Sequence, residues 1–112
     1  MSSQGAFLER FNKAFADVVG LPYVLPVSNG TVGLHLALHG LDLKPGDEVI
    51  VPSLTYIASV NMIALAGATP VFAEVRAEDW VLDPEDVARR ITPRTRAIMP
   101  VHLYAGVCDM DR

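Results

Sequence analysis

A short polar segment, Ser28-Asn29-Gly30-Thr31, lies where an apolar run ends and a helical pattern begins. The free N–H groups at a helix start, together with the positive end of the helix dipole, form a binding site for anions such as phosphate. Gly30 allows a ligand to approach the backbone closely, and Thr31 adds a hydroxyl donor. The segment matches neither GxxxxGK[ST] nor GxGxxG, so a nucleotide-binding Rossmann domain is not supported. Two interpretations stay open: an anion site, or a plain turn with an asparagine-glycine bend and a capping threonine.

A second candidate, Tyr56, follows the apolar run 48–52 after a short loop. Its ring is expected at the same sheet edge as the polar segment, where an exposed aromatic face can stack on a flat cofactor ring. A tyrosine at this position can equally pack in the core or at a helix end. Position alone does not separate these interpretations.

Metal chemistry and nucleophilic catalysis find little support in the remaining residues. His35 and His39 are spaced to share one helix face, but no third ligand accompanies them, and we predict no metal site. His35 is expected to pack and His39 to face the negative end of its helix. Ser28 lacks the GxSxG context of a nucleophile.

The basic residues are expected to form a solvated, charge-balanced face next to a group of acidic ones, including a Glu85–Arg89 pair. Over the 112 residues the formal charge is −4, so a nucleic-acid partner is not expected. No apolar stretch is long enough to span a bilayer, and we expect no membrane association and a cytoplasmic location. The single cysteine, Cys108, excludes an internal disulfide.

The pattern of the chain predicts the elements that position these residues. Apolar strands alternating with helices indicate a parallel sheet covered on both faces, whose ligands bind beyond the carboxyl ends of the strands. Gly20 is expected to end the first helix, and Asp83-Pro84 to begin the last one. The predicted helices span 6–19, 31–40, 56–66 and 84–91, and the predicted strands span 23–27, 48–52, 71–75 and 95–101.

Several long stretches, taken in order, resemble the DegT/StrS-type sugar aminotransferases. The match is specific because the motifs keep the family's order and register over nearly the whole chain. They lie at Val27–Leu38, Pro45–Ser53, Gly67–Val71 and Ile91–Tyr104.

This resemblance implies an α/β fold: part of the large domain of fold-type-I transferases that use pyridoxal 5'-phosphate (PLP), with a mostly parallel sheet flanked by helices in three layers. It implies that Gly30, Thr31 and Val32 hold the PLP phosphate and that Tyr56 stacks on the pyridine ring. The implied reaction is amination of a nucleotide-linked 4-keto-6-deoxy sugar with glutamate, usually in a homodimer. A PLP-dependent sugar dehydratase of the same family and a non-catalytic binding module remain alternatives.

The resemblance implies two catalytic groups that have no counterpart in the chain: the lysine that forms a Schiff base with PLP and an aspartate on the pyridine nitrogen. Both are expected beyond residue 112, because Lys13 and Lys44 lie on the first helix and in a surface turn and the position of the aspartate follows Asp111. We therefore expect residues 1–112 to form a single partial domain that is inactive alone. The predicted strands 23–27 and 95–101 are expected to lack their inner neighbours, which leaves apolar side chains such as Ile98 exposed.

Overall fold

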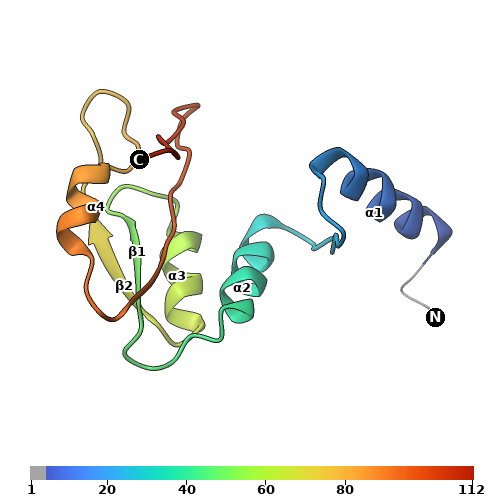
Figure 1. The fold of residues 1–112 in the computed structure, drawn as a ribbon, viewed down its shortest axis with the longest axis horizontal. Coiled ribbons are helices and arrows are strands. Elements are labelled where there is room, and N and C mark those ends of the chain that lie inside the picture. The colour runs from blue at the N-terminus through green and yellow to red at the C-terminus, as the bar shows by residue number, and fades with distance from the viewer. Residues whose placement is uncertain (1–4) are drawn as a thin grey trace.

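The computed structural model describes residues 5–112 and contains a sheet of three strands (Figure 1). The strands run parallel in the order β2-β1-β3, so the two edge strands flank the one that comes first in the sequence. The predicted parallel sheet is confirmed, with three strands instead of four. The elements are α1 (Ala6–Val19), α2 (Gly30–Gly40), β1 (Glu48–Pro52), α3 (Ile57–Leu65), β2 (Thr69–Ala73), α4 (Pro84–Arg90) and β3 (Thr95–Ile98).

The central strand β1 separates two hydrophobic cores. All five of its residues are buried, and successive side chains point to opposite faces of the sheet. Val49 and Val51 join Leu38 of α2 and Ile63 of α3 on one face, while Ile50 packs on the other face with Val87 of α4. Helices therefore cover both faces, and the predicted three-layer arrangement is confirmed.

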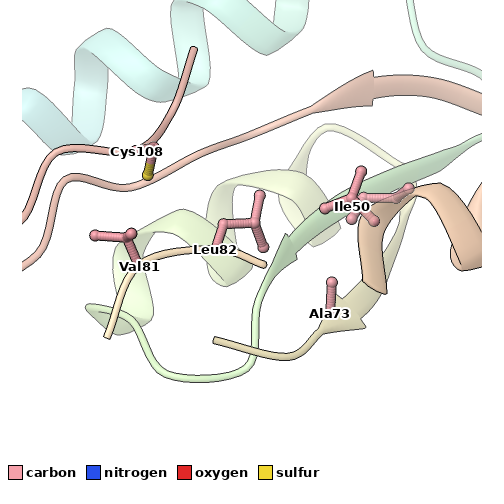
Figure 2. Packing of buried hydrophobic residues seen from close by; sticks show 6 residues of the cluster. Ile50, Ala73, Val81, Leu82 and Cys108 are labelled. Atoms are coloured by element: carbon pink, nitrogen blue, oxygen red, sulfur yellow. The ribbon is translucent and has the colours of Figure 1, made fainter. Parts of the chain in front are cut away.

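The core on the α4 face is completed by residues from loops (Figure 2). Val81 and Leu82 come from the loop after β2, and Cys108 comes from the segment after β3. The Cys108 thiol donates to the carbonyl of Val101 at 3.3 Å. Both residues belong to the segment after β3, so this bond closes the loop between them.

The helix ends follow the local sequence signals. Gly20 adopts a left-handed conformation (φ 69°), and its N–H donates to the carbonyl of Ala16. Asp83 caps α4, because its carboxylate accepts from the Glu85 N–H at 2.9 Å and Pro84 occupies the first helical position. Both predictions are confirmed.

The predicted strand 23–27 is wrong for this structure, in which these residues form no strand. A strand needs a neighbour to satisfy its backbone N–H and C=O groups, and this segment pairs with neither edge of the sheet. Its apolar side chains are exposed instead: 90% of Tyr23 and 71% of Leu25 face solvent. The sequence pattern identified a segment suited to a sheet but supplied no partner for it.

The other strand boundaries shift by a few residues. β2 begins and ends two residues earlier than predicted. β3 ends at Ile98 instead of Val101, because the Met99 N–H makes a last bond to the Ile50 carbonyl at 2.8 Å and Pro100 has no N–H to continue. Ile98 is 45% exposed, as expected for an edge strand, while Met99 and Val101 are half-buried.

Helix α1 lies apart from the sheet (Figure 1). None of its residues is buried, although Phe7, Phe11 and Phe15 form an apolar stripe along it. The radius of gyration is 16.2 Å, against roughly 13 Å for a compact domain of this length. Within residues 5–112 no helix is long and apolar enough to cross a membrane.

Candidate functional site

The carboxyl edge of the sheet gathers the candidate residues. Helices α2 and α3 pack against each other, and both begin at this edge (Figure 1). Gly30, Thr31 and Val32 open α2, and Tyr56 is the residue before α3. The structure therefore brings the two predicted parts of the site to one edge, with no hydrogen bond between them.

The first turn of α2 leaves two backbone amides available. Asn29, rather than the threonine of the plain-turn interpretation, caps the helix: its side-chain oxygen accepts from the Val32 N–H at 3.0 Å, and its carbonyl accepts from the Gly33 N–H at 3.1 Å. Within residues 5–112, the N–H groups of Gly30 and Thr31 have no hydrogen-bond partner. Of the three predicted phosphate ligands, Val32 thus has its amide already engaged.

The space in front of these amides is open. A side-chain carbon built at Gly30 would meet no atom within 4 Å, and both Gly30 and Val32 are exposed. The Thr31 hydroxyl lies on the same turn, in a half-buried residue. A small anion can therefore reach the two free amides and the hydroxyl together.

Tyr56 projects into solvent, with 70% of its surface exposed. It is not a core tyrosine, which removes one of the two interpretations of its sequence position. Its neighbour Thr55 has a buried hydroxyl oxygen that meets no hydrogen-bond partner within residues 5–112. Buried polar groups of this kind are uncommon, and each calls for an explanation. Sequence patterns gave no sign of Thr55.

A third segment at this edge, 99–108, packs on the loop after β2. The rings of Trp80 and Tyr104 meet edge to face with their centres 5.8 Å apart. Trp80, Tyr104 and Ala105 all have positive φ angles, which non-glycine residues adopt at a cost. His102, at the start of this loop, accepts from the Cys108 N–H through Nδ1 at 3.1 Å. The aromatic contact was not anticipated, because nothing local links residues so far apart in the chain.

The opposite, amino edge of the sheet carries paired charges. Thr92 donates to the buried Glu48 carboxylate at 2.6 Å and Arg94 donates to it at 2.8 Å, which together lower the pKa of Glu48. The Lys44 N–H and the Arg96 side chain donate hydrogen bonds to Asp47 and lower its pKa. These groups stabilise charges that the fold itself carries, and none faces the candidate site.

The charge-balanced face predicted from the sequence has its arginines paired with carboxylates: Arg89, Arg90, Arg94 and Arg96. The partner of Arg89 was wrong: it binds Asp86 at 3.0 Å, not Glu85, which instead meets Arg112 at 3.7 Å. Asp86 is buried and also accepts from Arg90 and from the Glu74 N–H, and these bonds lower its pKa to about 2. A buried carboxylate with two open acceptors attracts the arginines more strongly than an exposed one.

Neither metal binding nor lysine chemistry has a site among the described residues. No group of three or more potential metal ligands occurs in residues 5–112, where His35 is half-buried and His39 is exposed. Lys44 binds Asp42 at 2.5 Å in the turn before β1, roughly 16 Å from the other end of that strand. Lys13 lies on the separate helix α1.

Comparison with known proteins decides the family. The model of the DegT/DnrJ/EryC1/StrS aminotransferase family matches residues 1–112. The chain belongs to this family. It is 53% identical to a GDP-perosamine synthase from Caulobacter vibrioides, over 99% of this chain and 30% of that protein. It is 50% identical to a GDP-perosamine synthase from Escherichia coli O157:H7, over 100% of this chain and 31% of that protein. The chain spans about a third of the length of these relatives.

Solved structures of the family share the fold. DesV from S. venezuelae superposes with a TM-score of 0.88 at 48% identity, over 98% of this chain and 30% of DesV. The putative sugar aminotransferase Spr1654 from Streptococcus pneumoniae, solved in forms with PLP and with PMP, gives 0.89 at 35% identity, over 96% of this chain. These neighbours are fold-type-I aminotransferases, so the predicted fold class is confirmed.

Proposed function

We propose that this DegT-family chain is part of a PLP-dependent aminotransferase that acts on a nucleotide-linked 4-keto-6-deoxy sugar with glutamate as amino donor. The family match over residues 1–112 carries this proposal. Its finer part is supported by the similarity to GDP-perosamine synthases over nearly the whole chain. The family's solved structures with PLP and PMP support the cofactor.

The residues at the carboxyl edge fit the cofactor. The free N–H groups of Gly30 and Thr31, with the Thr31 hydroxyl, would hold the phosphate at the positive end of α2. Val32 lies in the same turn but would not donate to the phosphate, because its N–H is bound to the Asn29 side chain. The exposed ring of Tyr56 would stack on the pyridine ring.

The chain's own contribution to catalysis is then to bind and orient. When bound, PLP supplies the electron sink that allows the amino group of glutamate to replace the carbonyl oxygen of the keto sugar. Fixed amides at the phosphate and a ring against the pyridine plane hold the cofactor in one orientation, which lowers the entropic cost of the reaction. We propose that the covalent lysine lies outside these residues, since Lys13 and Lys44 both lie away from Tyr56.

The deciding experiment uses the protein as its cells make it. Purified protein is expected to bind PLP, to lose the visible PLP absorbance when glutamate is added, and to add an amino group to a GDP-linked 4-keto-6-deoxy sugar, detected by mass spectrometry. Loss of a sugar hydroxyl without amination would identify the dehydratase alternative. A folded protein that binds no PLP would contradict the proposal and favour a non-catalytic binding module. Sedimentation of the same sample tests the proposed homodimer.

A further inference from the structure

Asn29 determines which backbone amides of α2 are free. Its side chain takes the N–H of Val32 and its carbonyl takes the N–H of Gly33, while its own amide group donates to the Ser28 hydroxyl at 3.4 Å. The first turn of a helix has four N–H groups without intrahelical partners. The Asn29 side chain satisfies one of them, that of Val32, while the Gly33 bond to the Asn29 carbonyl is the first regular bond of the helix; the N–H groups of Gly30 and Thr31 stay free, adjacent and open to solvent.

Helix capping alone does not explain why position 29 holds a neutral asparagine instead of an aspartate. Asparagine and aspartate cap helices about equally well, and the helix dipole favours the aspartate. Helix α4 follows that preference, with Asp83 as its cap and with Glu85 and Asp86 in its first turn. The first turn of α2 carries no acidic residue. A carboxylate at position 29 would stand next to any phosphate held by Gly30 and Thr31 and would repel it.

We propose that Asn29 is a positioning residue for the cofactor phosphate. Asn29 engages the N–H groups of Val32 and Gly33, so the phosphate is confined to the free amides of Gly30 and Thr31. Its neutral side chain places no negative charge beside those two amides. The inference rests on the proposed function, because it assumes that a phosphate binds at this turn. Asn29 itself is not required to touch the cofactor.

The test compares Asn29→Asp with Asn29→Ser in the protein as its cells make it. For each variant we would measure the dissociation constants of PLP and of pyridoxal, which lacks the phosphate, and the melting temperature without cofactor. Aspartate keeps the cap, so the melting temperature should stay the same or rise. The dissociation constant of PLP should rise by about tenfold or more, and less in high salt, while that of pyridoxal changes by less than about twofold.

Asn29→Ser keeps a neutral capping oxygen and serves as the matched control. It should bind PLP within about twofold of the wild type. PLP binding by Asn29→Asp equal to the wild type would overturn the inference and leave the proposed function standing. Equal losses of PLP and pyridoxal affinity together with a lower melting temperature would also overturn it, since Asn29 would then act only on folding. A wild-type protein that binds no PLP would contradict the proposed function and the inference together.

Discussion

The two edges of the sheet differ in how completely their polar groups are satisfied. At the amino edge, Asp47 and Glu48 each accept hydrogen bonds from neighbours that lower their pKa values. At the carboxyl edge, the amides of Gly30 and Thr31 have no partner within residues 5–112 and are open to solvent. Satisfied groups stabilise a fold, whereas exposed unsatisfied groups are available to a ligand. The difference supports the carboxyl edge as the proposed binding site.

Strained backbone is concentrated at the carboxyl edge. Of the four non-glycine residues with positive φ within residues 5–112, Trp80, Tyr104 and Ala105 lie in its loops, and Asp42 lies in the turn before β1. The strained loop stays in place because it is packed closely: a side-chain carbon at Gly106 would lie 2.9 Å from the Asp79 carbonyl oxygen. Strain of this kind is typical of functional sites, where the surrounding packing maintains it.

The largest effect is expected from Gly106→Ala. The added carbon would contact the Asp79 and Leu103 carbonyl oxygens and Val81, so the two loops must separate, at a cost of about 1–3 kcal/mol of unfolding free energy. Chemical denaturation measures this loss. Gly40→Ala is the control, because a carbon there meets no atom within 4 Å and should not lower stability. Equal stabilities of the two variants would show that the loops are not held by close packing.

Tyr56→Ala tests the proposed binding site directly. Removing the exposed ring should raise the dissociation constant of PLP by about tenfold with little change in melting temperature, because the ring supports no core. Tyr56→Phe keeps the aromatic face and should bind PLP nearly as well as the wild type. Fluorescence titration of PLP measures both variants. An unchanged affinity in Tyr56→Ala would remove the stacking role.

Ala105→Gly should relieve part of the strain at the carboxyl edge. Ala105 has a φ of 68°, which glycine adopts without steric cost, so stability should rise by about 0.5–1 kcal/mol. Thermal unfolding provides the measurement. The same change at Ala88, in the middle of α4, should instead lower stability by about 1 kcal/mol. A loss of stability at both positions would mean that the loop is not strained.

The smallest effect is expected at the amino edge, from Glu48→Gln. The lowered pKa of Glu48 means that its carboxylate stabilises the fold above the usual pKa of a glutamate, and that this contribution is lost as the pH falls through the lowered value. The variant should therefore melt below the wild type at neutral pH, and the difference should vanish in acid. PLP affinity at neutral pH should not change. A constant difference at all pH values, or weaker PLP binding, would contradict the separation of the two edges.

Features that depend on nearby residues were predictable. The end of α1 at Gly20, the start of α4 at Asp83 and the buried strand β1 all followed from their own segments. Tyr56 was identified at the correct edge because it follows a strand of the parallel sheet, whose carboxyl ends lie together. The turn at Gly30 lies at the same edge although the strand predicted before it, 23–27, does not form. The plain-turn interpretation took Thr31 as the cap, whereas the structure caps α2 with Asn29, the better capping residue by type.

The helices, three of the four predicted strands and the family could be predicted from the sequence, because they depend on residue types and on spacings of a few positions. Which polar groups remain free depends on the tertiary fold. Whether 23–27 becomes a strand depends on a partner from elsewhere in the chain. Arg89 prefers Asp86 over Glu85 because Asp86 is buried beside β2, where it accepts from the Glu74 N–H. Such contacts depend on three-dimensional geometry and burial, which spacing along the chain does not contain.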